Sequence, residues 1–252
     1  MESINKKGLS SSALHIWAMF FMLCDHAYRT IFTNCEFLTC IGRLAFPMFA
    51  FMVVEGFYHT SNKKKYFLRM LFFGLISEIP FNLMLTAQWF FPFYQNVMFT
   101  FAIGLCMIYL LDKQQRKITK DSWIGPAFLS LLILGFFSLI ALIAGVDYGM
   151  GGILMIAVFF YCRKKNCLTY LLQVGLLYYI NTEVVGGLIY PVQLGNLYFE
   201  IPCQGLALLS LPFIWAYNGQ KGYNAKWFKY FCYAFYPAHA LILFLIAYAL
   251  YF

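Results

Sequence analysis

Long apolar runs recur along the whole chain and alternate with short loops. The runs are continuous rather than alternating with a period of two. Because a backbone in lipid must satisfy its own hydrogen bonds, such runs predict helices rather than the strands of a barrel. We therefore expect an all-α polytopic transmembrane helical bundle formed by a single domain over residues 1–252. Its spans are predicted at residues 13–33, 42–60, 66–87, 96–111, 123–144, 149–162, 167–181, 203–217 and 229–252.

The stretch 182–202 leaves the number of spans open between nine and ten. It is apolar, but Gly186, Gly187 and Pro191 interrupt it. If it stays on the outer side or re-enters the membrane, the bundle has nine spans and the loop around Lys221 lies inside. If it crosses fully, there are ten spans and that loop lies outside. We favour nine.

Basic residues fall in every second loop. Clusters stand at Lys63–Lys65 and Arg163–Lys165, whereas the loops at 34–40 and 145–148 carry no lysine or arginine. Cytoplasmic loops of membrane proteins are enriched in these residues. The pattern predicts a cytoplasmic N-terminus, and we expect the chain to be integral to a bacterial cell (inner) membrane.

Composition excludes a soluble domain. Of the 252 residues, 62% are hydrophobic and 11% are charged, whereas a soluble domain is roughly a quarter charged and about half apolar. The net charge of +8 does not indicate nucleic acid as a partner, because the topology already accounts for the basic clusters. No zinc or other metal spacing is present among the eight cysteines, although Cys35 and Cys40 share a loop and could form a disulfide.

Ionisable residues inside the predicted spans are the candidates for chemistry. Asp25 and His26 lie near the middle of the first span, and Arg43 begins the second. Such residues are costly in hydrocarbon and are kept where they pair or act. Adjacent residues do not face each other on a helix, so we expect Asp25 to serve Arg43 or Arg29 while His26 points into a cavity. A packing ion pair, and an Arg43 that reaches for the interface, are the alternatives.

Further polar residues follow in the second and third spans. Glu55 and His59 share a face and could hold each other or line the path of an anionic donor, although His59 could be a simple interface residue. Glu78 and Asn82 share a face around Pro80, where a kinked helix is typical of a cavity wall.

Four later features complete the candidate set. Asn96 opens the fourth span, where a helix-capping role is equally open. Tyr148 stands in a glycine-rich turn, and His239 lies behind a proline in the last span, where it could also be a packing residue. The lysines Lys63, Lys64 and Lys65 could attract phosphates.

Together these segments resemble the TraX family. The resemblance is carried, in order along the chain, by LCDH, IGRLAFPMFAFMVVEGFYHTSNKKKY, LISEIPFN, NVMFTFAIG, DYGMGGILMI and FYPAHALIL. It implies acetylation of the N-terminus of a conjugative pilin, and a likeness to transmembrane acyltransferases that use cytoplasmic acyl-CoA and a catalytic intramembrane histidine. The acceptor itself is not implied for this chain.

The resulting hypothesis is an acyltransferase that takes an acetyl group from acetyl-CoA, needs no metal, and lies among membrane lipids. His26 would be the general base, with Asp25 or Glu78 supporting it. The predicted acceptor is an amine or hydroxyl of an unknown protein, glycan or lipid. Lys63–Lys65 would hold the CoA phosphates, and His26, Arg43 and Glu78 should line one cavity. A proton-coupled transporter and a non-catalytic surface-appendage assembly factor are the alternatives. The predicted substrate-binding residues are Arg43, Glu55, His59, Asn82, Asn96, Tyr148 and His239.

Overall fold

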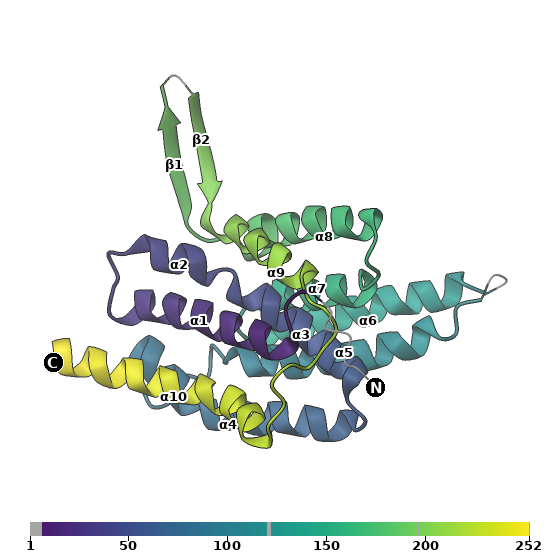
Figure 1. The fold of residues 1–252 in the computed structure, drawn as a ribbon, viewed down its shortest axis with the longest axis horizontal. Coiled ribbons are helices and arrows are strands. Elements are labelled where there is room, and N and C mark those ends of the chain that lie inside the picture. Colours follow the sequence, from purple (N-terminus) through teal and green to yellow (C-terminus); the bar gives the residue numbers. More distant parts are fainter. Residues whose placement is uncertain (1–6, 120–121, 196, 252) are drawn as a thin grey trace.

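The fold is a bundle of helices from which one β-hairpin projects (Figure 1). The structure is a computed structural model that describes residues 7–119, 122–195 and 197–251. Its elements are α1 (Ser11–Thr30), α2 (Glu36–Gly42), α3 (Ala45–His59), α4 (Lys63–Thr86), α5 (Val97–Gln115), α6 (Ile124–Ile143), α7 (Gly149–Tyr161), α8 (Cys167–Tyr179), the π-helical η1 (Ile180–Val185), β1 (Ile189–Leu194), β2 (Leu197–Pro202), the 3-10 helix η2 (Cys203–Ser210), α9 (Leu211–Trp215) and α10 (Lys226–Tyr251).

Helix α3 forms the centre of the bundle. It packs against α1, α5 and α7, while α10 covers α1 and α4 on one side of the molecule. Its apolar side chains are buried on several faces, including Met48, Val54 and Phe57. A helix that is apolar all round is expected to lie in the middle of a bundle. Helix α3, which has the densest mixture of apolar and ionisable residues, is therefore the core of the bundle.

The predicted helical membrane protein is confirmed in outline, but the predicted number of spans is not. Within the described residues, five segments are long and apolar enough to cross a membrane: Glu36–His59, α4, α5, α6 and α10. In α6 only 17% of the apolar window is buried within the protein, so its outward side chains require lipid. Phe252, the end of the last predicted span, lies outside the described residues.

The difference has physical causes. Helix α1 has the length of a span, at 20 residues, but Asp25, His26 and Arg29 make it too polar to count by composition alone. Helix α7 has only 13 residues, which is short for a bilayer about 30 Å thick. The predicted spans at 167–181 and 203–217 are α8 with the start of η1, and a 3-10 helix followed by the five residues of α9.

The ambiguous stretch 182–202 does not cross as a helix. The chain takes positive φ angles at Gly186 (66°) and Gly187 (124°), which end the helical segment. It then forms the antiparallel hairpin β1–β2, paired from Ile189 with Pro202 to Leu194 with Leu197. Both strands of this two-stranded sheet are edge strands, where proline such as Pro191 is tolerated. The hairpin extends away from the helices (Figure 1).

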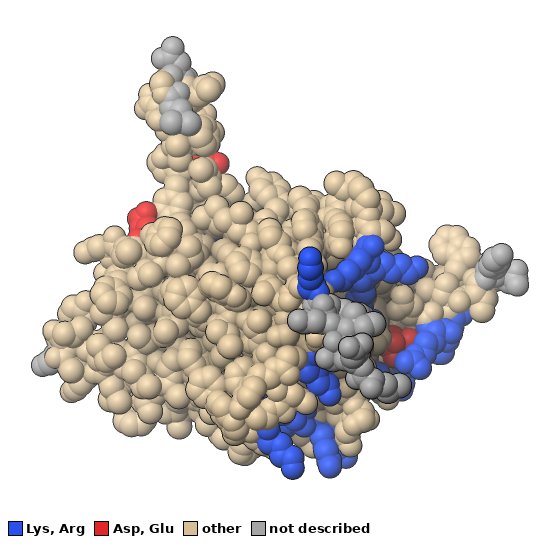
Figure 2. Space-filling view, viewed as in Figure 1, with Lys and Arg blue, Asp and Glu red and all other residues tan. Residues whose placement is uncertain are grey.

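Lysine and arginine side chains gather at one end of the helices on the face drawn in Figure 2. That end holds the connections from α3 to α4, from α5 to α6 and from α7 to α8 (Figure 1). We call it the basic end. Two arginines, Arg29 and Arg43, instead lie within the bundle beside Asp25. The fold thus separates the basic loops from these two arginines, whose side chains are 38% (Arg29) and 12% (Arg43) exposed.

Candidate functional site

The first cluster of the site is centred on Asp25. Its carboxylate accepts a hydrogen bond from the Thr39 hydroxyl at 2.8 Å and pairs with Arg29 Nε at 3.2 Å and with the Arg43 guanidinium. Helices α1 and α2 can approach this closely because of Gly42, since a Cβ there would stand 2.5 Å from the Asp25 Cβ. Both arginines named as partners of Asp25 in the sequence contact it.

Arg43 links neighbouring segments inside the protein and does not extend to the membrane interface. Its guanidinium donates at 3.1 Å to Gln204 Oε1, and Gln204 Nε2 donates at 2.9 Å to Asn181 Oδ1. Gln204 and Asn181 are buried. This chain connects α2, η2 and η1. Sequence analysis missed Gln204 and Asn181, because they lie in irregular segments with no motif around them.

His26 forms a pair with His239 of α10. The His26 Nδ1 and the His239 Nε2 are 2.7 Å apart, and the two rings stack with centroids 4.9 Å apart. The His239 Nδ1 lies 2.7 Å from the Phe235 carbonyl oxygen, which can only accept. The His239 Nδ1 therefore carries the proton.

That contact fixes the proton on His26 as well. With its Nδ1 protonated, a neutral His239 presents Nε2 as an acceptor, so His26 must donate from its Nδ1. The His26 Nε2 is then left with a free lone pair, and no hydrogen-bond partner for it occurs among the described residues. The pair thus aims a basic nitrogen at the space around it.

That space is a small cavity of about 40 Å³. Asp25, His26, Arg29, Tyr94, Asp147 and Tyr148 are among its lining residues. A volume of this size holds water or a small reacting group. The half-buried His26, two carboxylates and an arginine therefore line one small space.

The wall opposite α1 comes from the turn before α7. The Tyr94 hydroxyl donates to Asp147 Oδ1 at 2.5 Å, and the Thr100 hydroxyl donates to the Asp147 carbonyl oxygen at 2.5 Å. Burial raises the pKa of the Asp147 carboxyl, whereas the Tyr94 hydrogen bond and Arg29 lower it. Tyr148 has a φ of +62° and stacks on Phe46 with ring centroids 3.8 Å apart. Sequence analysis missed Tyr94 and Asp147, although Asp147 adjoins the predicted Tyr148.

Glu78 and Asn96 form a separate pair, so the predicted single cavity of His26, Arg43 and Glu78 is wrong. Asn82 is buried, and its Nδ2 has no hydrogen-bond partner among the described residues. Glu78 Oε2 accepts from Asn96 Nδ2 at 2.5 Å, and the Asn96 side chain also caps α5 by accepting from Met98 N at 3.0 Å. These contacts use Glu78 to hold α4 against α5. Helix α4 instead presents Phe81 to the cavity, whose described lining includes neither Glu78 nor Arg43.

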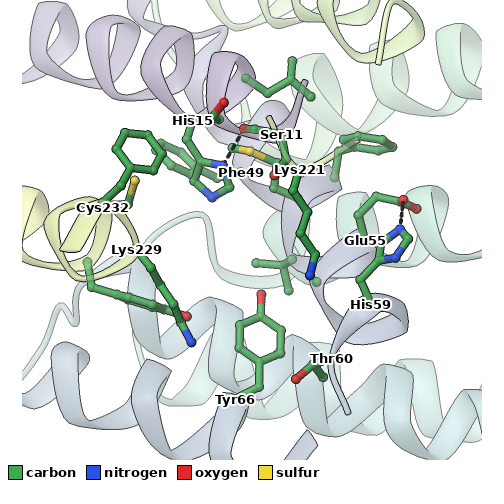
Figure 3. A pocket seen from close by; sticks show the side chains of 18 of the residues that line it. Ser11, His15, Phe49, Glu55, His59, Thr60, Tyr66, Lys221, Lys229 and Cys232 are labelled. Carbon is green, nitrogen blue, oxygen red and sulfur yellow. Dashed lines mark hydrogen bonds and ion pairs between the residues drawn. The ribbon is translucent and has the colours of Figure 1, made fainter. Parts of the chain in front are cut away.

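A larger cavity of about 390 Å³ opens near the basic end, between α1, α3, α4 and α10 (Figure 3). His15 lines it, and its Nδ1 lies 2.7 Å from the Ser11 carbonyl oxygen. Because that oxygen accepts, the other ring nitrogen of neutral His15 carries no proton. Lys221 reaches into the same space near Tyr66 (Figure 3). Sequence analysis did not select His15, which stands at the very start of the first span.

Glu55 and His59 also line the larger cavity, and they hold each other at 3.3 Å. Arg163 donates to Glu55 at 3.0 Å. The predicted phosphate-binding lysines, Lys63–Lys65, are not among the described lining residues of this cavity. They follow closely after His59 and Thr60, which do line it. Its cations are Arg69, Lys221 and Lys229.

Phe49 of α3 lines both cavities. One ring therefore stands between the larger space at the basic end and the small space beside His26.

Comparison with known proteins identifies the family. The chain matches the TraX protein family over residues 10–247. It belongs to the TraX family. The resemblance inferred from the sequence motifs is thus confirmed.

This TraX protein is 29% identical to the probable fimbrial assembly protein FimC, serogroup H1, of Dichelobacter nodosus. The similarity covers 93% of this chain and 94% of that protein. No solved structure matches this chain. The arrangement of the site in this TraX protein therefore rests on its own geometry.

Proposed function

We propose that this TraX protein is an integral membrane acyltransferase that moves an acetyl group from acetyl-CoA to an amine or hydroxyl acceptor. The single observation that carries the proposal is the histidine pair. A half-buried His26 that lines a cavity and keeps its Nε2 unprotonated is a general base ready for use. A packing histidine would have both nitrogens engaged.

The donor would enter from the basic end, which we propose to be cytoplasmic, with the N-terminus on that side of a bacterial inner membrane. The larger cavity has space for the pantetheine arm, and Arg69, Lys221 and Lys229 supply positive charge for the CoA phosphates. The apolar depth of the cavity, with Met52, Met98 and Phe101, would take the uncharged thioester end. Phe49 would have to turn aside for the thioester to reach His26.

The proposed reaction is a direct transfer. His26 Nε2 takes a proton from the acceptor amine or hydroxyl, whose nitrogen or oxygen attacks the thioester carbonyl carbon. A tetrahedral oxyanion forms and collapses as the carbon–sulfur bond breaks. The departing CoA thiolate takes the proton from the His26 imidazolium, so that CoA and the acetylated acceptor leave and the enzyme is unchanged.

The residues around the small cavity suggest the remaining roles. Arg29 and the Tyr148 hydroxyl line the cavity and could donate to the oxyanion. Asp25 would hold both arginines, and His239 would position His26. Asn82 and Asn96 were predicted to bind the acceptor. Asn96 is occupied with Glu78 and the α5 cap, so it is better understood as a support for α4 and α5. The buried Nδ2 of Asn82 has no hydrogen-bond partner among the described residues, so Asn82 keeps its proposed role.

Replacing His26 tests the proposal. Purified protein in liposomes would receive acetyl-CoA labelled in the acetyl group, and label transferred to water or to an added amine would be measured. His26→Ala should lower transfer by about 10²–10⁴-fold. Ser130→Ala, which removes a hydroxyl that bonds to Pro126 in α6 and to Tyr161 in α7 and does not line the small cavity, is the matched control. Full activity in His26→Ala would refute the base assignment, and no turnover in the wild type would favour a transporter.

A second candidate function is support of fimbrial assembly without catalysis. The observation in its favour is the name of the relative from Dichelobacter nodosus. Cells lacking the gene would be complemented with wild type or His26→Ala, and surface fimbriae would be counted. Restoration by wild type alone would join assembly to catalysis. Equal restoration by both would favour the non-catalytic role.

A further inference from the structure

Two thiols meet where the β-hairpin joins the helical bundle. Cys40 lies in α2 and Cys203 is the first residue of η2, directly after β2. Their Sγ atoms are 3.9 Å apart although the residues are 163 positions apart in the sequence. Sulfur atoms at this distance need only small side-chain rotations to reach bonding distance.

The position of the pair has a structural consequence. Arg43 donates a hydrogen bond to Gln204 at 3.1 Å. Cys203 directly precedes Gln204, and Cys40 is three residues before Arg43. Any movement of the hairpin base away from α2 would break that bond, and with it one of the contacts that hold Arg43 against Asp25. A covalent link between the two thiols would prevent that movement.

The compartment also suits a disulfide. Helix α2 and the base of the hairpin, which carry the pair, lie away from the basic end (Figures 1 and 2). If the basic end is cytoplasmic, as proposed above, the thiols face the oxidising outer side, where disulfides persist. Cys40 is partly exposed, whereas Cys203 is buried, with 3% of its surface exposed. An oxidant could therefore reach Cys40 first.

We propose that Cys40 and Cys203 form a disulfide that clamps the hairpin base onto α2. The Cys40 thiolate attacks one sulfur of an oxidising protein disulfide and forms a mixed disulfide, releasing the other sulfur as a thiol. The Cys203 thiolate then attacks Cys40 Sγ and displaces the oxidant. The two cysteines lose two protons and two electrons, and the oxidant leaves as a dithiol.

Counting free thiols tests the assignment. Cells would be quenched in acid, and the denatured protein would be treated with a maleimide that adds a fixed mass to each thiol. Of the eight cysteines, six should react before reduction and all eight after it. Cys203→Ser should show seven reactive thiols under both conditions, because Cys40 loses its partner. Eight reactive thiols in the unreduced wild type would overturn the proposal.

A matched variant separates this pair from the pair suggested by the sequence. Cys35→Ser should show five reactive thiols before reduction and seven after, because the bond between Cys40 and Cys203 is intact. If Cys35 were bonded to Cys40, the same variant would show seven before reduction, and the proposal would fail. A reductant should also lower the unfolding temperature of the wild type but not that of Cys203→Ser. None of these results depends on acyl transfer.

Discussion

At the scale of the residue, the site depends on charges that neutralise one another inside the bundle. Asp25 is 11% exposed at its side chain and is shared by Arg29, Arg43 and Thr39. A single buried carboxylate or guanidinium is costly, but a group with several partners is tolerated. Removing one of the charged partners should therefore lower the stability of the fold by more than the intact ion pair contributes to it.

Asp25→Asn should lower the free energy of unfolding by about 3–5 kcal/mol, because it leaves Arg43, whose side chain is 12% exposed, without its counter-charge. Thermal unfolding in detergent would measure this. The double variant Asp25→Asn with Arg43→Gln should lose less than the sum of the two single variants, since the uncompensated charge is gone. Strict additivity would show that the pair does not couple.

His239 should act through the tautomer of His26. His239→Ala removes the acceptor for His26 Nδ1 and should lower transfer by about 10–100-fold, as loss of orienting partners does at other imidazoles. His239→Gln can still accept from Nδ1 through its amide oxygen and should recover much of that loss. The readout is kcat and its pH profile, which a purely structural role would leave unchanged in shape. Equal loss in both variants at unchanged profile would contradict this role.

At the scale of the element, a close approach of two helices builds the polar cluster. A Cβ on Gly42 would stand 2.8 Å from the Asp25 Cα and 2.9 Å from its backbone nitrogen. Backbone atoms cannot turn aside as a flexible side chain can. The contact between α1 and α2 therefore needs glycine at this position, and small residues are the usual device for close helix packing in membranes.

Gly42→Ala should push α2 away from α1, weaken the contact of Arg43 with Asp25, and lower both the unfolding temperature and transfer activity. Gly135→Ala in α6 is the matched control, because nothing lies within 4 Å of its added Cβ. That control should be stabilised by about 0.5–1 kcal/mol, since alanine favours a helix over glycine. Equal behaviour of the two variants would rule out a tight approach at Gly42.

At the scale of the whole molecule, the distribution of charge predicts the orientation in the membrane that we propose. The basic loops gather at one end (Figure 2), while Arg29 and Arg43 pair with Asp25 within the bundle. Native cysteines mark both ends. Cys35, before α2, and Cys167, at the start of α8, are both exposed.

An impermeant maleimide should therefore label the two cysteines from opposite sides. In variants that retain only one of them, Cys35 should react in spheroplasts and Cys167 should react only in inverted vesicles. The reason is that cytoplasmic loops hold the lysines and arginines, and Cys167 follows Arg163–Lys165. The reverse pattern would place the N-terminus outside and would move the donor cavity to the wrong compartment.

The sequence by itself determined the class of the protein and many of the side chains at its centre. Apolar runs are a local signal, so helices and their basic loops follow from residue order alone. Asp25, His26 and Arg43 stood out for a similar reason, since ionisable residues are rare in such runs. The family motifs carried the same residues. The same local signal also gave too many spans. Helix α1 is too polar, and α7 and η2 are too short, to count as spans by length and composition.

Only the tertiary structure decided which polar groups meet. The His26–His239 pair joins residues 213 positions apart, and Glu78 turned toward Asn96 rather than toward His26. His15, Asp147 and Gln204 gained their roles from neighbours on other elements. A hydrogen bond depends on positions and directions in space, whereas residue order specifies only which faces of a helix are polar. The chemistry of the His26 imidazole was therefore fixed by packing between α1 and α10.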